Sequence, residues 1–252
     1  MAVASNQVAG FEAWQIQSLR LTILLNPAPV QAEQNWWERI IGTPPDQVAS
    51  QPRQALHSEQ GSFHNHSLNL RLQPGKIDWT LTAPMTAEVF ENIPAIGSFE
   101  AAVDIFRPVA HEWLNICPSF HRLALGMNLF QPAPNKIAAY ERIQQYLPDV
   151  RLDIRSSDFF YQINRVRNSR TAVQNLRINR LMKWNVLQLI VELQPLAVVT
   201  AQPASERFAC ALELDINTTA DRQGDLARND YEGIFNELLE LSREIARCGD
   251  IP

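Results

Sequence analysis

Three histidines near one another are the first residues in this chain whose type and spacing suit metal chemistry. His57, His64 and His66 lie within ten residues of each other, and imidazole is a common ligand of transition metals. If residues 63–70 form a strand, His64 and His66 point to the same face. The leucines at positions 68, 70 and 72 share that face. We therefore expect two partly buried histidines at the start of a core-facing strand, and no metal site.

A pair of carboxylates suggests hydrolytic chemistry. Glu213 and Asp215 alternate along a strand-like run and so share a face, and paired carboxylates can hold a divalent ion for hydrolysis. The sequence contains no glycine-rich nucleotide loop, Gly-x-Ser-x-Gly elbow or Cys-x-x-Cys pair. His111-Glu112 begins like a zinc-binding helix, but Asn115 stands where the second histidine would be. We predict no catalytic residue and no cofactor, with a metal-dependent hydrolase as an alternative.

A repeated tripeptide indicates a polar surface instead. Ile-Asn-Arg occurs at residues 163–165 and 178–180. A hairpin with its loop centred on Thr171-Ala172 would place Asn164 opposite Asn179 and Ile163 opposite Arg180. One face then carries the apolar side chains Tyr161, Ile163, Leu176, Ile178, Met182 and Trp184, with Arg165, Arg167 and Arg180 emerging at its rim. The other face carries Gln162, Asn164, Arg177, Asn179, Lys183 and Asn185.

The first half of the chain repeats this polarity. Residues 64–73 alternate between a histidine and leucine face and a face of Asn65, Ser67, Asn69, Arg71 and Gln73. Antiparallel sheets commonly leave one polar face in water, so a solvated face without function is the simpler alternative. The functional interpretation is a recognition surface, because amides and guanidinium groups bond base edges, phosphates and peptide backbones. The candidate binding residues are Arg165, Arg167, Arg177, Arg180, Asn164 and Asn179.

An internal repeat organises the elements that position these residues. An Arg-Leu strand, a Pro-Ala-Pro segment, a Glu-Arg-Ile tripeptide and a Pro-Asp pair recur in the same order. The first copy has them at residues 19–25, 27–29, 38–40 and 45–46, and the second at residues 121–127, 132–134, 141–143 and 148–149. The repeat predicts a duplication in which Arg39 and Arg142, and Ile40 and Ile143, occupy equivalent helix positions.

Hydrophobic periodicity gives both copies the same order of strand, helix, several strands and helix. The first half is predicted to contain a strand at 15–25, a helix at 32–41, strands at 53–60, 63–73 and 76–83, and a helix at 98–116 that Pro108 kinks or splits. The second is predicted to contain a strand at 120–130, a helix at 135–147, strands at 150–155, 158–167, 175–183, 185–200 and 207–216, and a helix at 225–247. This predicts an α+β fold with two related halves, residues 1–118 and 119–252. They share one antiparallel sheet with helices on one face. Trp36 or Trp37, Trp113 and Trp184 are expected in the core.

The predicted order of elements resembles the duplicated unit of the TATA-box-binding-protein-like fold in topology alone. The chain also resembles a sporadically distributed bacterial family of uncharacterised proteins of about 250 residues. The Arg-Leu-Ala-Leu strand at residues 122–125, the Leu-Asp-Ile strand at 214–216 and the closing helix carry that resemblance. Neither resemblance implies a chemistry, because one fold hosts many functions.

Composition and charge narrow the class of partner. The chain has 252 residues, 46% hydrophobic and 19% charged, with a net charge of −5. Residues 151–184 hold eight cations and two carboxylates, a net charge of +6, so the remainder carries −11. Nineteen arginines against three lysines favour a protein partner, since interfaces are enriched in arginine and depleted in lysine. The basic segment keeps nucleic acid as an alternative.

Localisation is the last prediction that the sequence allows. Three widely spaced cysteines and the absence of a secretory leader or an apolar membrane span predict a cytoplasmic protein. We expect a binding or scaffold protein without enzymatic activity that does not bind a membrane. The sequence is compatible with a monomer and with a homo-oligomer.

Overall fold

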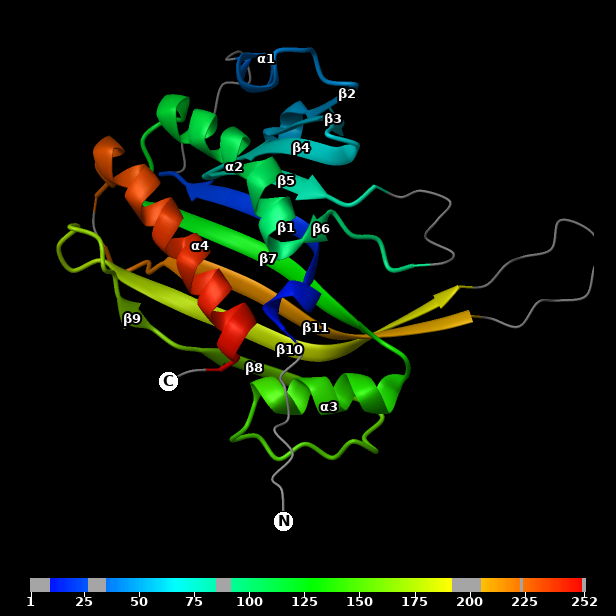
Figure 1. Ribbon diagram of the computed structural model, residues 1–252. Coiled ribbons are helices and arrows are strands. Elements are labelled where there is room, and N and C mark those ends of the chain that lie inside the picture. The colour runs from blue at the N-terminus through cyan, green and yellow to red at the C-terminus, as the bar shows by residue number, and fades with distance from the viewer. Residues whose placement is uncertain (1–9, 27–34, 85–91, 192–204, 223, 251–252) are drawn as a thin grey trace, which may run out of the picture.

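Alternating apolar and polar side chains build one antiparallel sheet, seen in the computed structural model of Figure 1. The structure describes residues 10–26, 35–84, 92–191, 205–222 and 224–250. Within these ranges the sheet has eleven strands, and four α-helices accompany it. The predicted α+β class with a large antiparallel sheet is therefore confirmed.

The described elements follow the predicted order of strand, helix, several strands and helix in each half of the chain. Residues 1–118 contain β1 (Gln15–Leu24), α1 (Trp36–Ile41), β2 (Gln47–Gln51), β3 (Leu56–Phe63), β4 (His66–Gln73), β5 (Lys76–Thr82), β6 (Gly97–Ser98) and α2 (Phe99–Ile116). Residues 119–252 contain β7 (Arg122–Ala133), α3 (Lys136–Tyr146), β8 (Phe160–Asn164), β9 (Arg167–Asn168), β10 (Arg177–Val191), β11 (Ser205–Thr218) and α4 (Tyr231–Cys248). Part of the predicted helix at 32–41 and of the predicted strand at 185–200 lies outside the described residues.

The strand order places the first strand of each half at the centre of the sheet. The order is β2-β3-β4-β5-β1-β7-β11-β10-β8, with β6 beside β1 and β9 beside β10. In each half the first strand pairs with the last long strand of that half, β1 with β5 and β7 with β11. The two halves meet where β1 pairs with β7.

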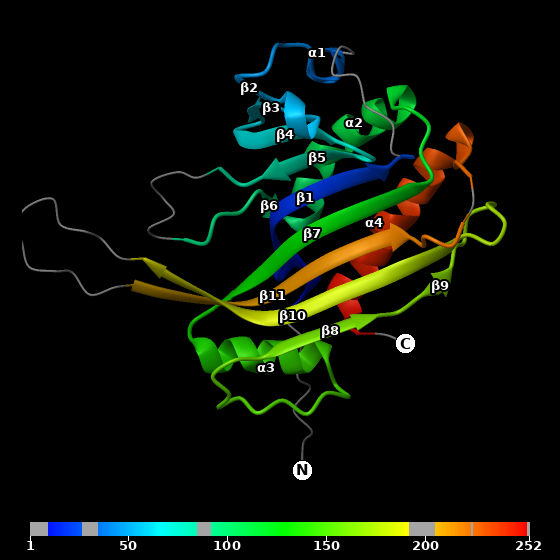
Figure 2. The same cartoon turned by 180° about the vertical axis from the view of Figure 1, so that it is seen from behind.

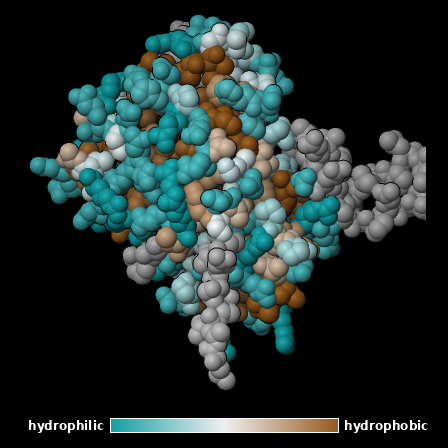
Figure 3. All heavy atoms as spheres, in the orientation of Figure 1, coloured by the Kyte–Doolittle hydropathy of each residue, from teal (hydrophilic) through white to brown (hydrophobic). Residues whose placement is uncertain are grey.

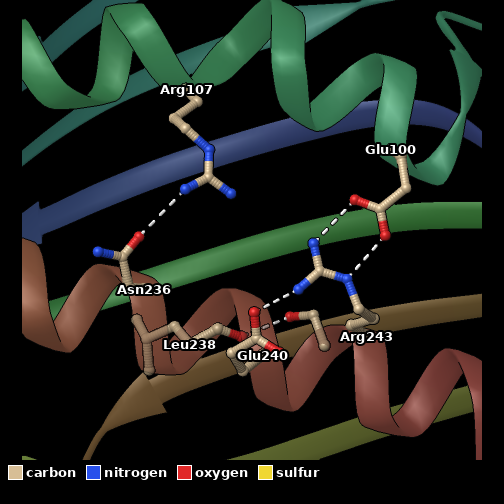
Figure 4. A network of polar contacts seen from close by, with 7 residues as sticks. Glu100, Arg107, Asn236, Leu238, Glu240 and Arg243 are labelled. Carbon is tan, nitrogen blue, oxygen red and sulfur yellow. Dashed lines mark hydrogen bonds and ion pairs between the residues drawn. The ribbon is translucent and has the colours of Figure 1, made fainter.

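The helices lie on one face of the sheet, and the opposite face is uncovered by helices, as Figures 1 and 2 show from its two sides. The helix α2 packs on β1, α4 on β7 and β11, and α3 on β10 and β11, while α1 contacts α2. Arg243 of α4 joins the two long helices with bonds of 2.7 and 2.8 Å to the Glu100 carboxylate of α2 (Figure 4). Seen from the helix side, the surface is mostly hydrophilic with scattered hydrophobic patches (Figure 3).

The core lies between the sheet and the helices, and the tryptophans belong to it as predicted. Trp36, Trp37, Trp113 and Trp184 are at most 3% exposed. In α2, apolar residues recur at helical spacing and are buried, namely Ala102, Val103, Phe106, Val109, Ala110, Trp113 and Leu114. Apolar and polar residues alternate along the strands because one face of the sheet buries large aromatic and aliphatic side chains.

Several sequence predictions about elements were wrong. The predicted strand at 63–73 starts only at His66, because His64 and Asn65 have φ angles of 49° and 64° and make the two-residue turn between β3, which ends at Phe63, and β4. Residues 150–155 form no strand, since the side chain of Gln144 bonds the backbone of Val150 and Leu152. The described parts of the runs at 175–183 and 185–200 share a single strand, β10, and Pro108 does not split α2. Within the described residues, no helix is long and apolar enough to cross a membrane.

Candidate functional site: the open sheet face

The face opposite the helices, here called the open face, is mostly polar, with Leu181 and Phe160 among its apolar side chains. Strand pairing aligns its side chains in rows that run from β3 to β8. One such row is Gln60, Asn69, Thr80, Arg20, Gly126, Asp215, Leu181 and Asn164. The apolar neighbours of these residues along each strand point to the helices and are largely buried. The predicted sorting of polar and apolar side chains is thus confirmed on β4, β5, β8 and β10.

A chain of amides crosses the open face of the second half. Asn164 on β8 donates to Asn179 on β10 at 2.9 Å, and Asn179 donates to Asn217 on β11 at 2.9 Å. Asn217 donates to the Asp215 carboxylate at 2.9 Å and accepts from Arg122 on β7 at 3.0 Å. These bonds fix the orientation of each amide, so the surface is preorganised rather than freely solvated.

The predicted hairpin register was wrong by two residues. Asn164 lies opposite Leu181 and Ile163 opposite Met182, and Arg165 and Arg180 exchange backbone bonds of 3.2 Å. A shift of two residues leaves each side chain on its original face, which is why alternation alone could not detect the error. Asn164 and Asn179 still touch, as diagonal neighbours.

The six predicted binding residues divide between the two faces of the sheet. Asn164, Asn179 and Arg177 lie on the open face, whereas Arg165, Arg167 and Arg180 lie on the helix side. Arg180 does not emerge at a rim: it is 4% exposed, and its Nε donates to the Arg165 carbonyl at 3.1 Å. Burial, together with Arg167, lowers the pKa of this guanidinium.

The arginines on the helix side are engaged by the C-terminal region of the chain. Arg165 makes two bonds of 2.8 Å to the carboxylate of Asp250, which also accepts from the Tyr161 hydroxyl at 3.0 Å. The bonds from Arg165 and Tyr161 hold the pKa of Asp250 below its usual value. Arg167 pairs with Glu244 of α4 at 3.3 Å. The carboxylates that neutralise this cluster are therefore Asp250 and Glu244.

The open-face arginine of the predicted set is also paired. The Nε of Arg177 donates to Asp221 at 3.1 Å, and its Nη2 contacts the same oxygen. Hydrogen bonds from Thr219 and Arg177 lower the pKa of Asp221 to about 2. Both side chains are half-exposed, so solvent weakens this ion pair.

Two other arginines of the open face have no hydrogen-bond or ion-pair partner among the described residues. Arg20 on β1 lies over Gly126 on β7. A Cβ atom added to Gly126 would lie only 3.3 Å from the Nη2 atom of Arg20. It lines a hollow of about 210 Å³ together with Ser18, Asn128, Glu213 and Asp215. The hollow therefore offers a guanidinium, an amide and two carboxylates in one place.

The second unpaired arginine, Arg71 on β4, lines a separate hollow of about 240 Å³ near the β2 edge. Gln51, Ser58 and Asn69 also line it, and the described lining residues include no carboxylate. Asp78 lies directly across from Arg71, but its carboxylate is bound to Thr22 at 2.5 Å and to Lys76 at 2.9 Å. Arg71 is exposed and remains available.

The residues considered for metal chemistry are not gathered into a metal site. Glu213 and Asp215 do share the open face, but Lys183 bonds Glu213 at 2.6 Å and Asn217 bonds Asp215. His64 lies in the turn, while His57 bonds Glu59 at 2.9 Å on β3. In the described parts of the chain, no three or more histidine, cysteine or acidic side chains lie close enough to hold a metal ion.

Comparison with known proteins adds no assignment, since no family model, curated protein or solved structure matches this chain.

The sequence analysis did not include Arg20 and Arg71 among the candidate binding residues. Alternation had placed Arg71 on the polar face, and Arg20 occupies the same kind of position in Leu-Arg-Leu-Thr. What could not be foreseen is which arginines find a carboxylate, because those carboxylates come from distant parts of the chain such as Asp250.

Proposed function

We propose that this chain is a protein-binding or scaffold protein without enzymatic activity, and that the open face is its contact surface. The observation that carries the proposal is a preorganised polar face with two hollows, each containing an unpaired arginine. On the helix side, by contrast, the predicted arginine cluster is already engaged by Asp250 and Glu244. Arginine is also enriched at protein interfaces.

The two halves are proposed to descend from a duplication, as the repeat predicts. The repeat aligns Arg20 with Arg122 and Thr22 with Ala124, and the pair Thr22 and Ala124 lies at the β1–β7 contact. A two-fold axis through that pair would exchange Arg20 with Arg122. Arg39 and Arg142 fit the same relation, since α1 and α3 each follow the first strand of their half. The resemblance in topology to the TATA-box-binding-protein-like unit rests on this relation.

Nucleic acid is the second candidate, and the unpaired guanidinium groups favour it, because they could contact phosphates. Against it, a polyanion draws its affinity from many cations on the face that it contacts. Three cations of the face are already paired, namely Lys76, Lys183 and Arg177. The contact surface therefore favours a protein over a nucleic acid.

Photo-crosslinking in the native host tests the proposal. A benzoylphenylalanine replaces Asn128, which is exposed at the centre of the open face, or Glu38, which is exposed on α1 at the helix side. We expect a protein adduct of defined mass from position 128 and none from position 38. Adducts from position 38 alone, or an adduct of nucleic acid at position 128, would contradict the proposal.

A further inference from the structure

The hollow around Arg71 differs in its charge from the hollow around Arg20, here called the central hollow. Its donors are the Arg71 guanidinium, the Asn69 and Gln51 amides and the Ser58 hydroxyl. In the central hollow, by contrast, Glu213 and Asp215 stand beside Arg20. A negatively charged group is therefore attracted to the Arg71 hollow, while the central hollow attracts it more weakly.

An unpaired guanidinium with amide and hydroxyl donors around it matches a carboxylate. The planar fork of arginine binds a carboxylate through two parallel hydrogen bonds, and neighbouring donors satisfy the remaining oxygen lone pairs. Asp78 cannot serve as this partner, since Thr22 and Lys76 occupy its carboxylate. No other described carboxylate bonds Arg71, so its guanidinium is open to an acceptor from another molecule.

The spacing of the two unpaired arginines indicates an extended acidic segment. Strand pairing places Arg20 opposite Thr80 and Thr80 opposite Asn69, and Arg71 lies two residues beyond Asn69 on the same strand. At ordinary strand spacings the two arginine Cα atoms are roughly 12 Å apart. In an extended peptide, side chains four residues apart lie on the same face and are about 13 Å apart.

We propose that the open face binds an acidic segment of a partner protein in extended form, with one carboxylate at Arg71 and a second near Arg20. The inference rests on the proposed function and specifies its partner. Arg71 makes the dominant contact because its hollow holds no competing carboxylate, and Arg20 contributes less. A polynucleotide fits less well, since the described part of the face offers its phosphates only two unpaired cations.

The test uses fluorescence anisotropy at low ionic strength with defined probes. These are a labelled peptide that alternates glutamate and serine, a matched peptide that alternates glutamine and serine, and a thymidine oligonucleotide of similar length. We expect the glutamate peptide to bind more tightly than the other two. Arg71→Gln should weaken its binding about tenfold, as the loss of a charge-assisted pair does. Arg20→Gln should weaken it less, and Arg39→Gln, an exposed arginine of α1, should leave it unchanged.

Three results would overturn the inference: equal binding of the glutamate and glutamine peptides, full binding by Arg71→Gln, or tighter binding of the oligonucleotide. Thermal midpoints of the variants confirm that each is folded, and none of the three side chains is buried. The crosslink at position 128 is measured separately. A protein adduct there together with equal binding of the two peptides would refute the acidic segment and leave the protein-binding proposal standing.

Discussion

The two faces of this sheet differ in whether their arginines are all engaged by the chain itself. On the helix side, Arg165 and Arg167 are paired with Asp250 and Glu244, and Arg180 is buried beneath them. On the open face, Arg20 and Arg71 have no partner among the described residues, although carboxylates lie close by in the sheet. The difference teaches that a cluster of cations in the sequence is a poor guide to binding, since the chain itself can neutralise it.

The helix side should be far more sensitive to truncation than the open face. Trp113 is fully buried and packs against the rings of Trp36 and Trp79, so Trp113→Ala should lower the free energy of unfolding by about 3–5 kcal/mol. Thr80→Ala on the open face is the matched control and should cost much less. Urea denaturation measures both, and an unchanged midpoint for Trp113→Ala would show that α2 does not pack as described.

The arginines of the helix side should act on stability. Replacing Arg165 and Arg180 together by alanine removes both bonds to Asp250 and leaves its carboxylate half-buried without its cation. We expect a fall of several degrees in the thermal midpoint, because an uncompensated charge remains. The remaining folded protein should bind the acidic peptide normally. A stable double variant that loses peptide binding would reverse our assignment of the two faces.

The contact between Arg165 and Asp250 also predicts a dependence on pH. The pKa of Asp250 is lower in the folded chain than in the unfolded chain, where aspartate has a pKa of about 3.9. Its stabilising effect is therefore complete above that pH and is lost as the pH falls through the folded value. Asp250→Asn should be less stable than the unmodified protein at pH 7, and the difference should vanish in strong acid. A difference that stays constant between these conditions would rule out this ion pair.

The open-face arginines should hardly affect stability. Arg71 is exposed and has no described partner, so Arg71→Gln should change the free energy of unfolding by less than about 0.5 kcal/mol. Calorimetry can compare it with Arg167→Gln, which breaks the pair with Glu244. If both variants lost the same free energy of unfolding, the arginines of the two faces would not differ in their effect on stability.

Local pattern was enough to predict much of this fold. Alternation along residues 76–83 and helical spacing along 98–116 identified β5 and α2 almost to the residue, because each buries one side on a shared core. The same reasoning failed at His64, where two positive φ angles form a turn that apolar alternation does not reveal. It also failed at residues 150–155, where the side chain of Gln144 holds the backbone in place of a neighbouring strand.

The candidate site was predictable as a surface but not as a set of residues. The sequence indicated that Asn164 and Asn179 would share a polar face, and they do. It could not indicate that Arg165 would meet Asp250, which is 85 residues away in the chain. Nor could it indicate that Gly126 leaves the space over which Arg20 lies, since that contact depends on the pairing of β1 with β7.

The affinity of the glutamate and serine peptide for two matched variants, Arg71→Gln and Arg167→Gln, tests the central claim most directly. Each variant removes one positive charge, the first from the open face and the second from the cluster engaged by α4. Our account predicts about tenfold weaker binding for Arg71→Gln and unchanged binding for Arg167→Gln. Weaker binding for Arg167→Gln with full binding for Arg71→Gln would contradict it.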